Sequence, residues 1–168
     1  LPDVPNLLGW TVQGTDYGGQ GFYDLALAVD PLDANHIVAG GVNLWESHDG
    51  GGGWQCIGHW FGAEQVPEVH ADHHAIGFVP GTHDVVSAHD GGVSRLHEGG
   101  AEDLNQGLDI GQIYRFAFSE QNRNRWLSGW QDNGVNLLDE RAHARIIGAD
   151  GFHCMIDPQD PDILYAAE

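Results

Sequence analysis

Apolar and polar positions follow one another in short stretches of about six residues that recur along the whole chain. Four of these stretches share one shape, an apolar run that closes at a proline or a polar turn. They are Leu25–Pro31, His74–Pro80, Tyr114–Glu120 and Phe152–Pro158. Short apolar runs bounded by turn residues are typical of buried strands. We therefore expect each run to be the first strand of a repeated unit.

Further short strands follow each run after polar or glycine-rich turns. The second strands are expected over residues 36–40, 84–88, 125–129 and 162–166, the third over 43–47, 93–96 and 135–138, and a fourth only over 54–57 and 143–147. Four short strands in a unit of about 40 residues are the signature of a β-propeller blade. No segment has a sustained helical period with caps, so the pattern predicts an all-β chain of four-stranded antiparallel blades.

The repeats predict units over about residues 21–68, 69–108 and 109–148, and a partial unit over 149–168. Residues 1–20 are interpreted as the end of a preceding blade, with Leu7–Trp10 as its outer strand. This makes a partial ring of about three and a half blades, whereas closed propellers have roughly 4 to 8. We expect residues 1–168 to belong to one propeller domain, with the remainder of the propeller as a partner.

The charge of the chain excludes several classes of function. There are 25 Asp and Glu residues against 6 Lys and Arg, which gives a formal net charge of −19. A chain this acidic is unsuited to nucleic acid or to an anionic membrane surface. No apolar stretch approaches the roughly 18 residues of a membrane span. Cys56 and Cys154 are too few for a disulfide framework. The charge itself fits either an acidic secreted protein or a high-salt habitat.

The segment Ser47–Trp54 fits the pattern S-x-D-x-G-x-x-W of the Asp box. In such a turn Ser47 and Asp49 bond to turn amides, Gly51 allows positive φ, and Trp54 packs beneath. With the surrounding motifs the chain resembles Asp-box (BNR-type) propellers of the sortilin-like and xyloglucanase-like group, especially secreted glycosyl-hydrolase-like proteins of Bacteroidetes. Those motifs are Tyr23–Pro31, His70–His74, Asp90–Val93, Gln131–Gly134 and Asp150–Gly151. The resemblance implies a secreted protein and a carbohydrate-directed function.

Acidic side chains stand at matching places in successive repeats, where each first strand begins or where the second strand turns. They are Asp24, Asp72, Asp90, Asp132 and Asp150. If these loops share one rim, the aspartates converge on the mouth of the propeller channel. The alternative is that each Asp satisfies turn amides locally, the commonest role of Asp beside Gly.

Glycoside hydrolysis needs one carboxyl as acid and another as base or nucleophile. Asp90 and Asp132, on adjacent predicted blades, are the candidate pair. Trp130 directly precedes Gln131 and Asp132 and is the candidate sugar-stacking platform; blade packing is the alternative for this and the other tryptophans. Gln131, Asp24 and Asp150 complete the predicted substrate-binding set.

The segment His70–His74 is a second candidate site. In a regular strand residues 70, 72 and 74 point to one side, so His70 and Asp72 are candidate ligands for zinc or another transition metal. Neighbouring ligands on one strand lie about 6 to 7 Å apart, a poor spacing for one tetrahedral ion. His74 aligns with an apolar core position and is expected to be packed. Ca²⁺ or another divalent cation on the acidic rim is an alternative, and no cofactor is required.

We interpret the chain as a secreted propeller module that binds or hydrolyses polysaccharide, with xyloglucanase-like ancestry. The alternative is a non-catalytic, sortilin-like module that holds an extracellular protein or spaces other domains. The expected partners are polysaccharide or an extracellular protein, and neither nucleic acid nor membrane insertion is expected.

Overall fold

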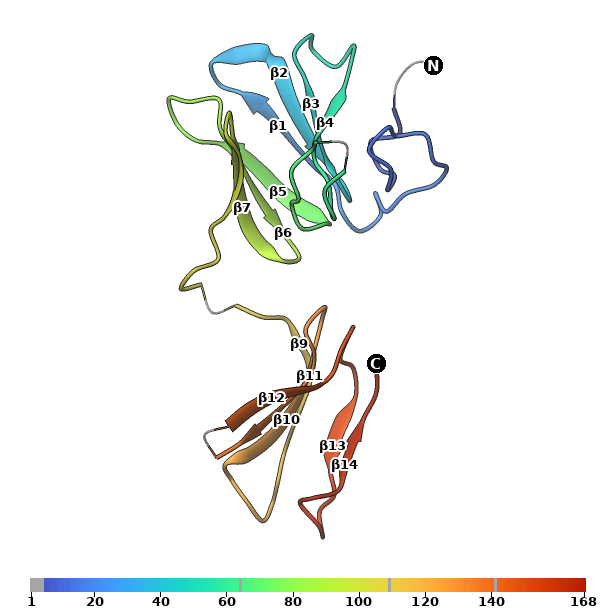
Figure 1. Cartoon of the computed structure of the whole chain (residues 1–168), viewed down its shortest axis with the longest axis vertical. Coiled ribbons are helices and arrows are strands. Elements are labelled where there is room, and N and C mark those ends of the chain that lie inside the picture. Colours follow the sequence, from blue (N-terminus) through green and yellow to red (C-terminus); the bar gives the residue numbers. More distant parts are fainter. Residues whose placement is uncertain (1–4, 64, 109, 141) are drawn as a thin grey trace. The chain divides into compact units, whose positions relative to one another are not determined.

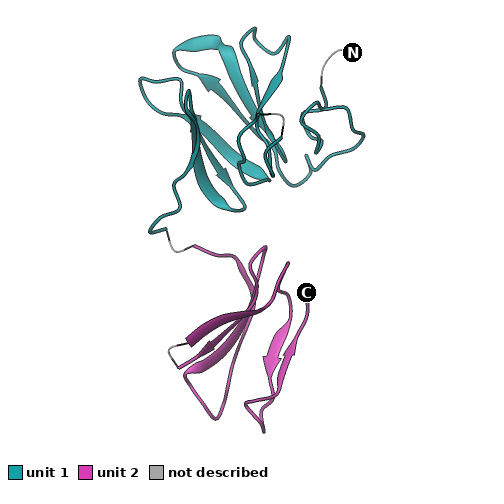
Figure 2. Ribbon diagram, viewed as in Figure 1, with its two compact units in different colours: residues 1–108 teal, residues 109–168 magenta. Residues whose placement is uncertain are grey.

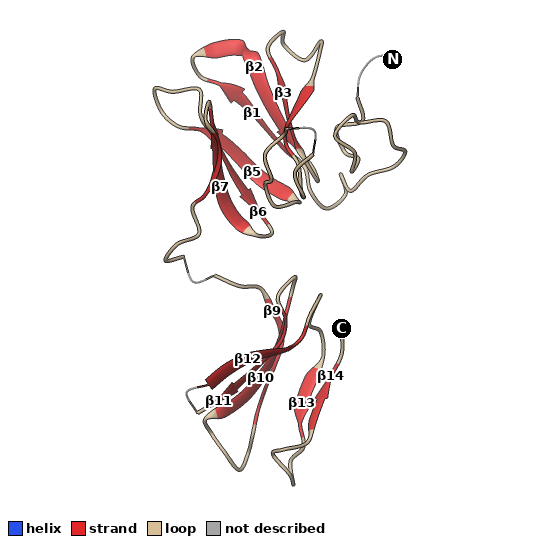
Figure 3. Cartoon of the chain, viewed as in Figure 1, coloured by secondary structure: helices blue, strands red, loops and turns tan. Residues whose placement is uncertain are grey.

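The protein is built from short antiparallel strands (Figures 1 and 3). The computed structural model describes residues 5–63, 65–108, 110–140 and 142–168, and it contains no helix in these ranges, hence none that could cross a membrane. The chain divides into two compact units, residues 1–108 and 109–168 (Figure 2). The division falls at the predicted boundary between the second and third repeats.

The first unit contains two four-stranded sheets, each a simple antiparallel meander. Their strands are β1 (Ala26–Asp30), β2 (Asp33–Gly40), β3 (Leu44–Ser47) and β4 (Gln55–Gly58), then β5 (His73–Phe78), β6 (Val85–His89), β7 (Gly92–His97) and β8 (Gly100–Asp103). The first strands of the two sheets, β1 and β5, contact each other. Val38 and Leu44 of one sheet and Val85 and Leu96 of the other share an apolar core with Val69.

The second unit repeats this plan with one complete sheet and the start of another. Its strands are β9 (Ile113–Phe118), β10 (Arg125–Trp130), β11 (Gly134–Asp139), β12 (Ala142–Ile147), and then β13 (Cys154–Ile156) and β14 (Leu164–Ala166). The first strand of the next sheet, β13, again contacts the previous first strand, β9. Leu127, Val135 and Ile156 form the core between them.

Four-stranded meanders that pack first strand against first strand are blades of a β-propeller. The three complete sheets and the two-stranded start of a fourth confirm the predicted all-β class, with about three and a half blades. Alternating side chains account for the cores, because one face of each strand meets the neighbouring blade. On the bare face of the first blade, Leu25, Leu27 and Val29 are 64%, 65% and 47% exposed.

Glycine closes the joint between consecutive blades in both units. Gly40 is the last residue of β2, and a Cβ there would lie 2.7 Å from Cβ of His73 at the start of β5. Gly129 lies near the end of β10, and a Cβ there would overlap the carbonyl oxygen of Phe152, just before β13. The incoming strand of the next blade therefore passes where a larger residue would stand.

The prediction of an outer strand over Leu7–Trp10 was wrong, because this segment consists of turns. Side chains hold the turns together. Asn6 Nδ2 donates to the carbonyl oxygen of Asp16 at 3.0 Å, and the Asp16 carboxylate accepts from Trp10 N and from Thr11 Oγ1, both at 2.6 Å. These local hydrogen bonds compete with a strand ladder for the backbone groups.

The fourth strand of the second blade, β8, has no counterpart in the sequence prediction. It pairs with β7 from His97↔Gly100 to Ser94↔Asp103. Its side chains are half-buried or exposed, so the strand carries no apolar signal. Backbone pairing alone defines it.

Candidate functional site

Two predicted site residues, Asp24 and Asp72, stand where β1 and β5 begin. The Asp24 side chain is fully buried, and neither of its carboxylate oxygens has a hydrogen-bond partner among the described residues. Burial, reinforced by the neighbouring Asp72 carboxyl, raises the pKa of Asp24 to about 6. Gln20 Nε2 donates to Asp72 Oδ1 at 2.8 Å. The pair can therefore retain a proton at pH values where an ordinary aspartate is ionised.

Asp90, one of the two predicted catalytic residues, lies at the same end of the first unit. The Tyr23 hydroxyl donates to Asp90 Oδ2 at 2.7 Å, and His74 Nε2 lies 2.7 Å from Asp90 Oδ1. Because an ionised carboxylate only accepts, Nε2 of His74 carries the proton in this pair. The Tyr23 and His74 rings meet edge to face, with centroids 5.1 Å apart. Asp90 is thus held by one donor that precedes β1 and another from β5.

The second unit holds the other predicted rim residues. Asp150 Oδ1 accepts from the backbone nitrogen of Asp132 at 2.8 Å, which is the turn-amide role that the sequence analysis weighed against a site. Trp130 Nε1 donates to Ser128 Oγ at 2.6 Å. The Tyr114 hydroxyl donates to Gln131 Oε1 at 2.9 Å. The residues Trp130, Gln131, Asp132 and Asp150 therefore stand in one hydrogen-bonded turn region of unit 2.

The five predicted rim aspartates fall into one group in each unit. Asp24, Asp72 and Asp90 belong to residues 1–108, and Asp132 and Asp150 to residues 109–168. The acid and base pairing of Asp90 with Asp132 stays a prediction.

The His70–His74 segment departs from the regular strand assumed for it. Asp72 has a positive φ of 65°, and the β5–β6 register shifts between His73 and Ala75. His73 is consequently the buried histidine, with Nδ1 2.6 Å from Ser87 Oγ, whereas His74 is exposed. The expectation of a packed His74 was wrong, because the left-handed Asp72 interrupts the alternation of side chains.

The metal assignment to His70 and Asp72 stays a prediction. The His70 ring is stacked on the His89 ring, with centroids 5.5 Å apart, and its Nδ1 lies 3.1 Å from the Ala71 carbonyl oxygen. Within the described ranges, neither His70 nor Asp72 joins a group of three converging metal-ligating atoms.

The Ser47–Trp54 turn connects β3 to β4 through its own side chains. Ser47 Oγ donates to Asp49 Oδ1 at 2.8 Å and accepts from Gly51 N at 2.9 Å. Asp49 Oδ1 also accepts from Gly53 N at 2.8 Å, and this amide, with Ser47, lowers the pKa of Asp49. Trp54 Nε1 donates to the Gly51 carbonyl at 3.1 Å, and Gly51 has a φ of 96°. These are the contacts expected of the four residues in that motif.

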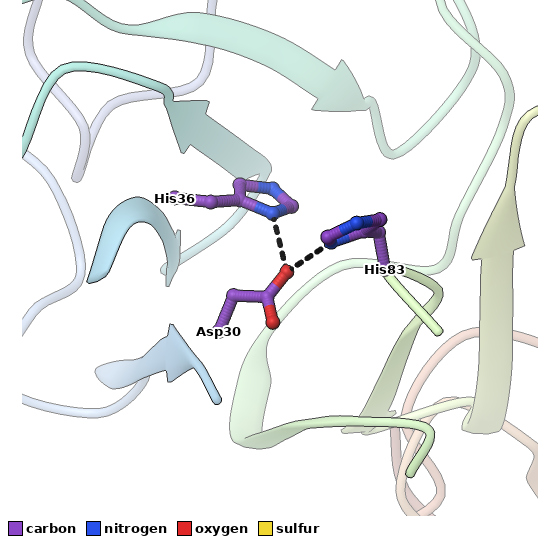
Figure 4. Close-up of side chains that lie close together, drawn as sticks. All are labelled: Asp30, His36 and His83. Atoms are coloured by element: carbon purple, nitrogen blue, oxygen red, sulfur yellow. Dashed lines mark hydrogen bonds and ion pairs between the residues drawn. The ribbon is translucent and has the colours of Figure 1, made fainter. Parts of the chain in front are cut away.

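The sequence analysis missed a cluster of histidines and carboxylates at the opposite ends of β1 and β5 (Figure 4). Asp30, the last residue of β1, is buried, and its Oδ2 lies 2.9 Å from His36 Nδ1 and 2.6 Å from His83 Nδ1. Burial opposes the charge of Asp30. The bonds from His83, the Leu32 amide and His36 outweigh it, so the pKa of Asp30 lies well below its usual range. The same contact raises the pKa of His83.

The cluster continues along β2 and β3. Glu46 Oε2 lies 3.4 Å from His36 Nε2 and 3.5 Å from His48 Nε2. The rings of His36 and His48 are stacked, with centroids 4.4 Å apart. Both histidines, with Glu46 and His83, line an open groove of about 970 Å³ between the two blades of unit 1. The local signal in the sequence is Glu46-Ser47-His48, which pairs in the sheet with the strand that starts near His36.

Comparisons with known proteins support no closer identification. No family model matches the chain, and no curated protein matches it. Similar solved structures include an ancestral GH74 enzyme, which shares 12% identity over 80% of this chain and 22% of that one, with a TM-score of 0.39. The GH74 xyloglucanase from Xanthomonas campestris shares 18% identity over 92% of this chain and 24% of its own, with a TM-score of 0.36.

A third similar structure, YCF48 from Cyanidioschyzon merolae, shares 13% identity over 88% of this chain and 48% of its own, with a TM-score of 0.36. The chain thus spans about a quarter to a half of these proteins. At these values the likeness defines neither a family nor an activity. The class of protein is defined by the blades themselves, as a β-propeller protein with a carboxylate-rich end.

Proposed function

We propose that the chain is part of a secreted β-propeller that binds polysaccharide at the end where β1 and β5 begin. The observation that supports this most is the contact of Tyr23 and His74 with Asp90, beside the buried carboxyl of Asp24. Sugar sites combine carboxylates, which accept bonds from hydroxyl groups, with exposed aromatic faces. Phe22 and Tyr23, which directly precede Asp24, are 91% and 43% exposed.

Hydrolysis is the second step of the proposal. A glycoside hydrolase keeps one carboxyl protonated and another ionised. Asp24 retains its proton to about pH 6, although its burial keeps it from touching a sugar directly. We assign the acid and base roles to Asp90 and Asp132, with Trp130, Gln131, Asp24 and Asp150 as the substrate-binding set. The motif resemblance to the xyloglucanase-like group motivates xyloglucan as the first substrate to test.

The test is affinity electrophoresis of the full chain in gels that contain xyloglucan or other neutral polysaccharides. We expect retardation that Asp90→Asn weakens about tenfold, since bonds to a charged acceptor contribute about 1.5–3 kcal/mol. Asp49→Asn, in the Ser47–Trp54 turn, is the matched control and should leave retardation unchanged. Equal retardation of wild type and Asp90→Asn, or none with any polysaccharide, contradicts the proposal.

A reducing-sugar assay on the same polysaccharides tests the catalytic step. We expect product from the wild type and none from Asp132→Asn. Binding without product leaves a carbohydrate-binding module and rejects hydrolysis. Repeating the assay after chelation tests whether a divalent cation such as Ca²⁺ is needed.

The alternative is a non-catalytic module that binds an extracellular protein or the remainder of the propeller. The exposed apolar side chains of Leu25, Leu27 and Val29 favour it, because neighbouring blades bury such faces. Light scattering of the full chain and of Leu27→Glu separates the two functions. Self-association that disappears in this variant, without polysaccharide retardation, favours the alternative.

A further inference from the structure

We propose that His36, Glu46 and His48 form a zinc site in the groove between the first two blades. The atoms that would bind the ion are His36 Nε2, Glu46 Oε2 and His48 Nε2, which lie within 4.8 Å of one another. This site lies apart from the proposed polysaccharide site, which is where β1 and β5 begin, and does not depend on it.

The hydrogen bond to Asp30 prepares His36 to bind a metal. Because the Asp30 carboxylate can only accept, Nδ1 of His36 carries the proton in their 2.9 Å contact. Nε2 of His36 then presents a lone pair. This atom is buried and has no hydrogen-bond partner among the described residues, although the Glu46 carboxylate lies 3.4 Å away. Carboxylate, histidine and metal in series is the usual arrangement around protein-bound zinc.

The spacing of the three atoms fits one ion. Zinc binds nitrogen at about 2.0–2.1 Å and carboxylate oxygen at about 2.0–2.2 Å, so ligand atoms at neighbouring corners of a tetrahedron lie about 3.3–3.5 Å apart. Glu46 Oε2 lies 3.4 Å from His36 Nε2 and 3.5 Å from His48 Nε2. The His48 side chain is 61% exposed, which leaves room for its ring to turn toward the ion.

The strand pairing brings these side chains to one face. Val38 pairs with Glu46 and Ile37 with Ser47, so the next step along the ladder sets His36 beside His48. Side chains two residues apart in a strand share a face. Ligands on a single strand are too far apart for one ion, but here the third ligand comes from the adjacent strand.

The alternative grouping of Asp30, His36 and His83 is less suited to a metal. Its atoms already lie 2.9 and 2.6 Å apart in hydrogen bonds, closer than ligands around one ion. Asp30 also accepts from the Leu32 amide at 2.7 Å. We therefore assign Asp30 as a positioning residue that orients His36 and connects it to His83 in the second blade.

The donor set selects the metal. Two imidazole nitrogens and one carboxylate suit zinc and neighbouring transition metals, whereas Ca²⁺ and Mg²⁺ prefer oxygen ligands alone. Three protein ligands leave a fourth position, which faces the open groove and would hold water. Bound metal would join β2 to β3 and, through Asp30 and His83, stabilise the joint between the blades.

The test is calorimetric titration of the chelator-treated full chain with ZnCl₂ near pH 7.5, together with the visible absorption spectrum of the Co²⁺-loaded chain. We expect one site, a tetrahedral Co²⁺ spectrum, and a higher melting temperature with zinc. His48→Ala and Glu46→Gln should each weaken zinc binding by at least the 10- to 100-fold typical of outer-shell changes. Their melting temperatures without metal report folding separately.

Two control variants distinguish this site from other histidines. His97→Ala removes an exposed histidine that lines the same groove, and His70→Ala removes the candidate ligand in the His70–His74 segment. Both should bind zinc as the wild type does. No binding by the wild type, unchanged affinity in His48→Ala and Glu46→Gln, or loss of the site in either control overturns the proposal.

Discussion

The Nδ1 atom of His73 lies 2.6 Å from Oγ of Ser87, and both side chains are fully buried. Burial, reinforced by the nearby histidines His89, His70 and His74, lowers the pKa of His73 to about 3. In the unfolded chain its pKa is about 6.5, so protonation of His73 favours unfolding. The contribution of neutral His73 to stability is therefore complete above pH 6.5 and is lost as the pH falls toward 3.

We predict that the free energy of unfolding of the full chain falls between pH 7 and pH 5. His73 alone should account for a loss on the order of 2 kcal/mol at pH 5. His89, whose pKa burial lowers to about 4, should add to the loss. Urea unfolding at several pH values measures it. His73→Asn keeps an acceptor or donor near Ser87 but does not titrate, and it should flatten the pH dependence; a curve parallel to the wild type contradicts the prediction.

Asp24 should have the opposite pH dependence. Its pKa is raised to about 6, so the folded state binds more protons than the unfolded state between pH 3.8 and 6. Stability contributed by protonated Asp24 is therefore lost as the pH rises through this window. Asp24→Asn should stabilise the chain at pH 7.5, by an amount on the order of 2 kcal/mol.

Asp49→Asn provides the matched comparison for Asp24→Asn. The pKa of Asp49 is lowered by the Gly53 amide and by Ser47, so its contribution is present above pH 3.8 and is lost as the pH falls. Asp49→Asn should therefore destabilise the chain at pH 7.5. Changes of the same sign in both variants would contradict this assignment.

The blade joints predict a strong dependence on glycine. Gly40→Ala and Gly129→Ala should each destabilise the chain by about 1–3 kcal/mol, because the added Cβ overlaps His73 or the Phe152 carbonyl. Gly77→Ala is the control, since nothing lies within 4 Å of a Cβ there. Thermal melts of the three variants measure the difference, and equal melting temperatures would show that the joints are not tightly packed.

The Ser47 hydroxyl should be the most important side chain of the Ser47–Trp54 turn. It bonds to Asp49 and accepts from Gly51 N while only 1% of the residue is exposed. Ser47→Ala leaves that amide without its partner and should cost about 1–3 kcal/mol. Thr15→Ala, at an exposed residue, should cost much less. Equal unfolding midpoints for the two variants would argue against this role.

The strands could be predicted because each blade buries alternate side chains between polar turns. Where that signal is absent, the prediction missed or misplaced a strand. Gly100–Asp103 has no buried apolar side chain and was missed. Leu7–Trp10 has apolar side chains but lies in turns that Asn6 and Asp16 stabilise. Apolar pattern therefore predicts strands only where side-chain hydrogen bonds to the backbone do not compete.

The sites were harder to predict than the strands. His36 and His83 bind the same Asp30 although 47 residues separate them in the chain. Their meeting depends on how one blade packs on the next, which no local pattern contains. The single left-handed residue Asp72 likewise changed which histidine of His70–His74 is buried. Aspartates at the starts of first strands were identifiable because their position follows from the repeat itself.

The glycines at the blade joints also bear on how such a chain can change in evolution. Gly40 and Gly129 make room for the next first strand in blades whose other residues differ widely. A joint formed by a missing Cβ places few demands on the blade that follows. Whole blades of different sequence can then be duplicated, exchanged or inserted between such joints, while the loops at either end of each blade diverge independently.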